Sequence, residues 1–127
     1  MKSVQLLLLL LALNGAQAPA QTGQSPAPAA TIGAAEQEAI MDRIEHGVRL
    51  PESAGPLASY ARSYALREDA RGTRIVAAVY VRGGTPGRRW VRETDLPMIE
   101  DGGCGIVSLL YDVPTQRIYD VACNGVA

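Results

Sequence analysis

The chain has 127 residues, of which 47% are hydrophobic, 20% are charged and 5% are aromatic, and its formal net charge is -1 at pH 7. These values are close to the average of globular proteins and allow one small domain. They exclude a collagen-like repeat, a chain that is disordered throughout and the strongly basic balance of a nucleic-acid-binding protein.

The first 20 residues have the pattern of a secretory signal peptide. Lys2 precedes an apolar run over residues 4–13, and small residues follow up to Ala20. The run is about half as long as the roughly 20 apolar residues that span a bilayer, and no cysteine directly follows it that could carry a lipid. We therefore expect cleavage after Ala20, no stable membrane anchor, and export to the periplasm or the medium.

Cleavage there would leave eleven arginines and no lysine against thirteen carboxylates, a net charge of -2. This near balance argues against steering toward polyanions, so no nucleic-acid partner is expected. Residues 21–33 are rich in Pro and Ala, carry no charge and show no periodicity, which predicts a flexible spacer. Residues 34–127 are then expected to form a single small domain.

A helix is predicted from Gly33 to His46. Its apolar residues recur at helical spacing, and its acidic residues share another face. The apolar set is Ile40, Met41, Ile44 and Val48, and the acidic set is Glu38, Asp42 and Glu45. Gly47 stands where a glycine often ends a helix.

Two strands are expected after the helix. Residues 57–66 alternate between larger and smaller side chains, which favours a strand, although Ala, Leu and Arg also form helices well. Residues 74–82 are rich in β-branched side chains and are bounded by turns, which indicates a strand more firmly. With a loop of about five residues between them, the two segments predict a hairpin.

The C-terminal part predicts a second hairpin. A short extended piece at residues 90–91 comes first, and Thr94 or Asp95 can then cap one helical turn before Asp101. Strands at residues 106–111 and 117–123 then flank a turn-forming stretch that contains Pro114.

The only two cysteines, Cys104 and Cys123, would lie almost opposite each other at the open end of this second hairpin. The Cα spacing across a hairpin is in the range that a disulfide needs, and an exported protein meets an oxidising compartment. We therefore predict a structural disulfide that closes a loop of about 20 residues and stabilises the protein by about 3 kcal/mol. A redox role or a zinc site would need closer cysteines or more ligands, so neither is expected.

These elements predict an α+β fold, with one helix packed on a mostly antiparallel sheet of about four strands. The strands form two hairpins, and the disulfide clasps the second one. Ile40, Met41 and Ile44 of the helix are expected to pack on residues of both hairpins. Those residues are Ile75, Ala77, Val79, Val107, Leu109 and Val121. Because both faces of residues 74–82 are apolar, this strand can also be buried on both sides.

Few residues offer catalytic or metal-binding chemistry. His46 is the only histidine and ends the predicted helix, where the helix dipole favours its charge, so we expect a solvated structural role. Asp42 and Glu45 share its helical turn, but no further ligand completes a metal shell. We expect no metal and no cofactor.

Glu100 and Asp101 precede two glycines, and a hydrolase that uses them together with Asp120 is one hypothesis. Adjacent residues of an extended chain point to opposite faces, so a turn-forming role of Asp101 is the stronger interpretation. The glycines of residues 102–105 can offer N–H groups to an anion, but no phosphate-binding motif accompanies them. A need for positive φ or close packing explains them equally well.

Arg88, Arg89 and Arg92 flank Trp90 and form the best candidate for a binding surface. Arginine and tryptophan often dominate interfaces through bidentate pairing and stacking. The alternative is that Trp90, in a chain without Phe, fills the core.

The C-terminal stretch contains Asp101-Gly102-Gly103-Cys104, then Tyr111-Asp112 and Arg117, and finally Cys123-Asn124-Gly125. It resembles short exported bacterial proteins of unassigned activity that carry a C-terminal disulfide hairpin. The resemblance covers the last third to two thirds of the chain and implies a bacterial envelope location. It implies no catalytic residue and no ligand.

The absence of a nucleophile motif and of a second histidine favours a small exported, non-catalytic binding or interaction domain. An envelope protein or a small anionic ligand is the expected partner, bound by the Arg–Trp segment or by an exposed strand edge. An inhibitor or immunity-type protein that blocks a hydrolase is the alternative, and a carboxylate-dependent hydrolase is a third hypothesis.

Overall fold

The computed structural model describes Gly15 and residues 31–125, and the chain divides into two units at residues 1–30 and 31–127. Apart from Gly15, the predicted signal peptide and most of the predicted spacer lie outside the described residues. In the second unit the folded part begins before the helix, because the side chain of Ile32 is buried in the core. No helix of the described part is long and apolar enough to cross a bilayer.

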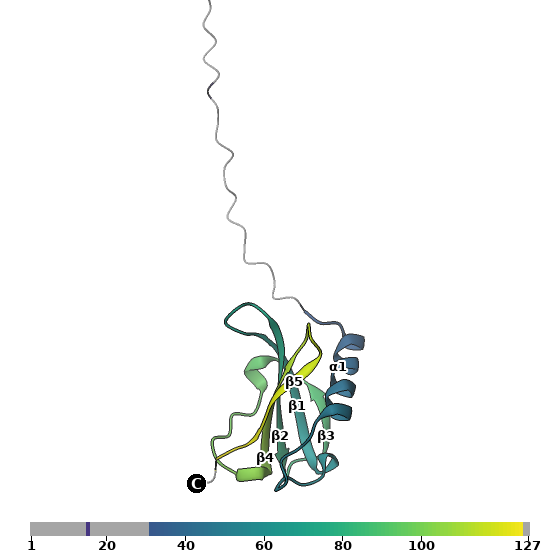
Figure 1. Ribbon diagram of the computed structural model, residues 1–127, viewed down its shortest axis with the longest axis vertical. Coiled ribbons are helices and arrows are strands. Elements are labelled where there is room, and N and C mark those ends of the chain that lie inside the picture. The colour runs from purple at the N-terminus through teal and green to yellow at the C-terminus, as the bar shows by residue number, and fades with distance from the viewer. Residues whose placement is uncertain (1–14, 16–30, 126–127) are drawn as a thin grey trace, which may run out of the picture. The chain divides into compact units, whose positions relative to one another are not determined.

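Among residues 31–125, one α-helix and five strands make up the fold (Figure 1). In chain order they are α1 (Ala34–Gly47), β1 (Tyr60–Glu68), β2 (Arg74–Arg82), β3 (Gly87–Trp90), β4 (Ile106–Asp112) and β5 (Arg117–Cys123). The strand order in the sheet is β3-β1-β2-β4-β5. β1 with β2, and β4 with β5, form the two predicted antiparallel hairpins. The α+β class is confirmed. Residues 60–68 form a strand and not a helix, whereas residues 57–59, at the start of the predicted strand, form a 3₁₀ turn.

The sheet differs from the expected one in its fifth strand. β3 pairs in parallel with β1, so that Ala61 lies opposite Gly87 and Tyr64 opposite Trp90. The sheet is therefore mixed, and it has five strands where about four were predicted. Four residues that include two arginines carry too little apolar alternation to predict a strand. Nothing local in the sequence determines which free edge such a strand joins.

The main core lies between α1 and one face of the sheet, which we call the helix face. Ile40, Met41 and Ile44 of α1 are buried there, as predicted. They belong to one cluster with residues of β1, β2 and β4. Those residues are Tyr60, Tyr64, Val76, Ala78, Tyr80, Val107, Leu109 and Tyr111. The predicted contacts with β4 are thus confirmed.

The predicted packing is wrong for β2. Val76, Ala78 and Tyr80 face the helix, whereas Ile75, Ala77 and Val79 face the opposite side. Both sets are apolar, so alternation in the sequence cannot assign the two faces. The register with β1 pairs Tyr64 with Ala78, and both residues belong to the cluster that packs against α1.

The opposite face of the sheet, which we call the open face, has no helix over it within the described residues. After β3 the chain returns across this side as residues 91–102, with a 3₁₀ turn at Glu93–Asp95, whereas α1 lies on the other side (Figure 1). A smaller buried set that includes Ala65, Ile75 and Ile106 belongs to this face. The returning segment covers only part of the open face.

The predicted disulfide joins Cys104 to Cys123, with the two Cα atoms 4.6 Å apart. Cys104 belongs to a 3₁₀ turn at Gly103–Gly105 just before β4, and Cys123 ends β5. The bond therefore closes the open end of the second hairpin, as the sequence predicts.

Candidate functional site

The alternation of side chains along β3 divides the predicted Arg–Trp surface. Arg88 and Trp90 point to the helix face, whereas Arg89 points to the open face. Trp90 is half-buried and packs against the core. Arg92 lies beyond the strand, where its Nε is 2.8 Å from Oδ2 of Asp95. The structure therefore does not bring these four residues together in one surface.

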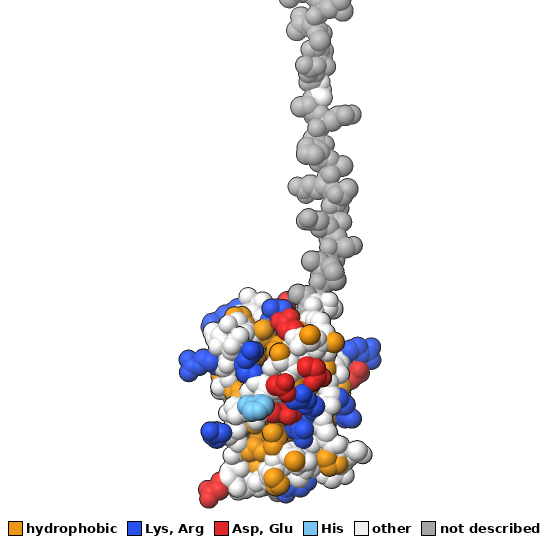
Figure 2. All heavy atoms as spheres, turned by 90° about the vertical axis from the view of Figure 1, so that its right-hand side faces the viewer, with side chains coloured by type: hydrophobic (Ala, Val, Ile, Leu, Met, Phe, Trp, Pro, Cys, Tyr) orange, Lys and Arg blue, Asp and Glu red, His pale blue; other side chains and the backbone are white. Residues whose placement is uncertain are grey.

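Arg88 joins β3 to α1 through three carboxylates. Its Nη2 lies 2.7 Å from Oε2 of Glu38, and its Nη1 lies 2.7 Å from Oδ1 of Asp42 and 3.3 Å from Oε2 of Glu45. Figure 2 shows the interleaved acidic and basic side chains on this side of the molecule. The acids recur at helical spacing, so one guanidinium reaches all three. The contact with Asp42 is the main cause that raises the pKa of Arg88.

Glu45 continues this network into the core. Its Oε1 accepts hydrogen bonds from Nε of Arg62 and from the hydroxyl of Tyr64, both at 2.8 Å. The Tyr64 hydroxyl also lies 2.9 Å from that of Tyr80. Burial raises the pKa of Tyr64 and raises that of Tyr80 to about 12. Because no buried side-chain nitrogen or oxygen of the described residues lacks a partner, we interpret the network as a structural link between α1 and the sheet.

The residues considered for a metal site are directed to other partners. Nδ1 of His46 lies 2.7 Å from the carbonyl oxygen of Asp42 at the end of α1. The carboxylates of Asp42 and Glu45 face Arg88. Within residues 31–125, no group of three His, Cys, Asp or Glu side chains is placed to hold a metal ion.

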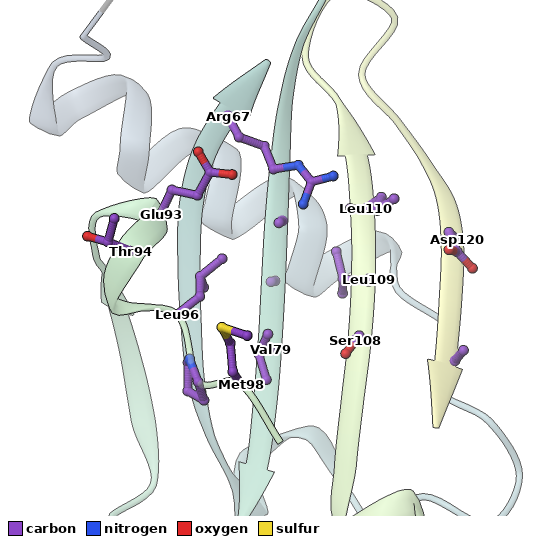
Figure 3. Close-up of a pocket in the computed structure, with 14 residues that line it drawn as sticks. Arg67, Val79, Glu93, Thr94, Leu96, Met98, Ser108, Leu109, Leu110 and Asp120 are labelled. Carbon is purple, nitrogen blue, oxygen red and sulfur yellow. The ribbon is translucent and has the colours of Figure 1, made fainter. Parts of the chain in front are cut away.

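A groove of about 590 Å³, which we call the main groove, crosses the open face (Figure 3). Its floor consists of small and aliphatic side chains of β2, β4 and β5, together with one serine. The floor residues are Ala77, Val79, Ser108, Leu110 and Ala122. One wall is formed by the returning segment, from which Leu96 and Met98 reach toward β2, with the end of Met98 beside Val79 in Figure 3. The volume is in the range of pockets that bind small molecules or side chains of a partner.

Met98 is an unusual residue for the surface of a small domain. Met98 is 95% exposed although it lies at the wall of the main groove, and the neighbouring Ile99 is 41% exposed. The flexible, polarisable side chain of methionine adapts to different apolar partners. Sequence reasoning missed this site. The sequence signal that could have indicated it is the apolar run of residues 96–99. This run follows a polar stretch and lies in neither a helix nor a strand.

The candidate carboxylates of a hydrolase do not meet in this groove. Asp120 lines it, whereas Glu100 and Asp101 are not among its lining residues. The side-chain amide of Asn124 donates to the carbonyl oxygens of Ile99 and Asp101, which fits the predicted turn-forming role of this segment. The other carboxylate of the groove is Glu93, which Figure 3 shows on the side opposite Asp120.

The glycine-rich turn at residues 102–105 uses its N–H groups within the fold. Gly102 and Gly103 have φ values of 117° and 52°, a region that side chains rarely adopt. The N–H of Gly103 donates to the carbonyl oxygen of Gly125, and that of Gly105 donates to Gly102. Backbone geometry therefore accounts for these glycines without a bound anion.

β5 is an edge strand and forms the outer border of the main groove. The N–H of Asn124 donates to the carbonyl oxygen of Ile106, and Cys123 lies opposite Val107. Because hydrogen bonding alternates along an antiparallel pair, the backbone groups of Val121 and Cys123 point away from β4. The free edge thus offers donors and acceptors at the spacing of a β-strand.

No family model, curated protein or solved structure matches this chain. The resemblance of the C-terminal stretch to short exported bacterial proteins stays a prediction.

Proposed function

We propose that this protein is an exported, non-catalytic interaction domain that holds an extended apolar segment of a partner protein in the main groove. The observation that carries the proposal is Met98, an almost fully exposed apolar side chain at the wall of an aliphatic groove. Together with the aliphatic floor beside it, Met98 forms a contiguous apolar surface, and such surfaces are typical of interaction sites. The disulfide supports export, because such bonds persist in oxidising compartments.

The edge of β5 favours an extended segment over a compact ligand. Such a segment can pair its backbone with the free groups of Val121 and Cys123. Every second side chain of the segment would then lie beside Asp120 and Ala122 and reach toward the aliphatic floor. The backbone contacts supply affinity, and the groove selects apolar side chains.

Charged side chains at the rim of the groove favour one orientation of the bound segment. Arg67 reaches from β1 across β2, and Glu93 and Asp120 lie on opposite sides of the groove (Figure 3). A partner with charged residues at matching positions gains orientation from these groups, whereas a like charge at the same position is repelled.

Site-specific photo-crosslinking tests the proposal. A photoreactive phenylalanine analogue replaces Ala122 in the groove or, as a matched control, the exposed Ala70 in the loop between β1 and β2. We expect one protein to be crosslinked in cells from position 122 and not from position 70. The crosslinked peptide should be an extended apolar segment, and a synthetic copy of it should bind the purified protein.

A charge at the groove wall should then weaken the binding of that peptide. Met98→Asp places a carboxylate on an exposed side chain, so the fold is retained, and we expect at least about tenfold weaker binding. Ala70→Asp, which adds the same charge outside the groove, should leave the affinity unchanged. The proposal fails if positions 122 and 70 crosslink the same proteins, if no protein is crosslinked, or if the two aspartate variants bind alike.

A further inference from the structure

A second hollow, of about 270 Å³, lies on the open face over β1 and its two neighbours, β2 and β3. We call it the Arg89 pocket. Its polar side chains are Ser63, Thr85 and Arg89, and its apolar side chains include Val81, Pro97 and Ile99. Pro97 borders both this pocket and the main groove, and the two share no other lining residue. The Arg89 pocket is therefore a separate site.

The charged side chain that lines the Arg89 pocket is positive. Its lining residues include one arginine and no carboxylate. Within the described residues Arg88 and Arg92 are paired with carboxylates, whereas Arg89 forms no ion pair. Its one side-chain hydrogen bond there runs from Nε to Oγ of Ser63, at 3.2 Å. The two terminal NH₂ groups of Arg89 thus stay available to an anion.

Ser63 adds a buried donor beside this guanidinium. Its side chain is 1% exposed, and its Oγ accepts the hydrogen bond from Arg89. This bond is the one that gives the buried oxygen a partner, and no hydrogen bond donated by the hydroxyl is found among the described residues. A buried hydroxyl is more stable when its hydrogen is bonded. An oxyanion in the pocket can accept hydrogen bonds from Ser63 and Arg89 together.

We propose that the Arg89 pocket binds a small organic carboxylate. Arg89 and Ser63 hold the carboxylate group, and a short apolar tail packs against Val81, Pro97 and Ile99. Ile99 is partly exposed, so the tail removes apolar surface from water. An inorganic anion would leave these walls uncovered. This activity goes beyond the interaction role of the main groove and does not depend on it.

The test is a titration of the isotope-labelled protein, isolated from cells that express the full chain, with sodium hexanoate. The amide chemical shifts report binding. Hexanol tests the need for the charge, and sulfate tests the need for the tail. We expect saturable shifts at amides around the pocket, with a Kd in the low millimolar range. Hexanol and sulfate should each bind at least about tenfold more weakly.

Two variants and one matched control locate the site. Arg89→Gln removes the charge while keeping a similar length, and we expect about tenfold weaker binding of hexanoate. Ser63→Ala should weaken it several-fold. Arg92→Gln removes the same charge from an exposed residue that lines neither hollow, and it should have no effect.

Three results would overturn the proposal. They are the absence of saturable shifts at a large excess of hexanoate, equal affinity for sulfate and hexanoate, and equal effects of the Arg89 and Arg92 variants. The first two are measured on the unmodified protein, so they decide the question even if a variant fails to fold.

Discussion

The hydroxyl of Tyr60 donates a hydrogen bond of 2.6 Å to the carbonyl oxygen of Cys104, across 44 positions of the sequence. The same hydroxyl accepts hydrogen bonds from the N–H of Gly55 at 3.0 Å and from Nη2 of Arg82 at 3.1 Å. The Arg82 guanidinium also lies 5.2 Å from the centre of the Tyr60 ring. One buried phenol therefore connects the disulfide turn, β2 and the loop that precedes β1.

Tyr60→Phe should lower the free energy of unfolding by about 1–3 kcal/mol, because it leaves the backbone groups of Cys104 and Gly55 without their partner. Chemical denaturation measures this loss. Tyr119→Phe is the matched control, since Tyr119 is 54% exposed and has no such partners within the described residues. Equal stability of the two variants would contradict this role of the Tyr60 hydroxyl.

Gly55→Ala should destabilise the protein through Arg82. A Cβ at position 55 would overlap Nη2 of Arg82, so the guanidinium has to leave Tyr60. In an Arg82→Ala background the same substitution should cost less, with a coupling energy of about 1 kcal/mol in a double-mutant cycle. Gly105→Ala, where a Cβ meets no atom within 4 Å, is the control. Additive effects of the two substitutions would refute the proposed clash.

Arg88→Met should lower the free energy of unfolding by about 1–2 kcal/mol, because three carboxylates of α1 lose a partly buried partner. The loss should shrink at high salt, which screens the repulsion among the acids that remain. Arg92→Met removes only the exposed pair with Asp95 and should leave the stability unchanged. A loss for Arg88→Met no larger than that for Arg92→Met would show that this network does not hold β3 to α1.

Alkaline pH should destabilise the fold through the buried tyrosines. The folded-state pKa of Tyr80 is about 12, above the ordinary value of 10.0, and that of Tyr64 is raised as well. The corresponding stability is fully present below pH 10 and is lost as the pH rises toward 12, by at most about 1.4 kcal/mol per pH unit for each tyrosine. Denaturation midpoints across this range measure the slope. It should be smaller in Tyr80→Phe, and an equal slope would exclude Tyr80 as a source.

Replacing both Cys104 and Cys123 by Ala should cost about 3 kcal/mol of stability, since the bond closes a loop of about 20 residues in the unfolded chain. Thiol titration of the unreduced, denatured protein should find no free thiol. Two free thiols per chain would mean that the bond is absent from the isolated protein.

Local patterns predicted the elements whose signals are contained in a short stretch of chain. The spacing of Ile40, Met41 and Ile44 gave a helix within one residue of α1 at each end. The β-branched run of residues 74–82 matched β2. The disulfide followed from the second hairpin, because a hairpin brings residues near its two ends together.

The candidate site could not be predicted in the same way. The sequence placed three arginines and a tryptophan side by side, but alternation along β3 sends Arg88 to the helix and Arg89 to the open face. The wall of the main groove comes from Leu96 and Met98, which are distant in sequence from Ala122 on its floor. Only the folded chain brings such residues to one place.

The helix, the two hairpins and the disulfide could therefore be predicted from the chain alone, since each depends on the periodicity or spacing of neighbouring residues. The tertiary structure decided the pairing of β3 with β1, the face of β2 that meets α1, and the hollows of the open face. These features depend on which strand edges pair and which apolar faces pack together. Short stretches of sequence do not distinguish one edge or one apolar face from another. Contacts between residues far apart in the sequence distinguish them, such as the ion pair of Arg88 with Asp42 and the pairing of Tyr64 with Ala78.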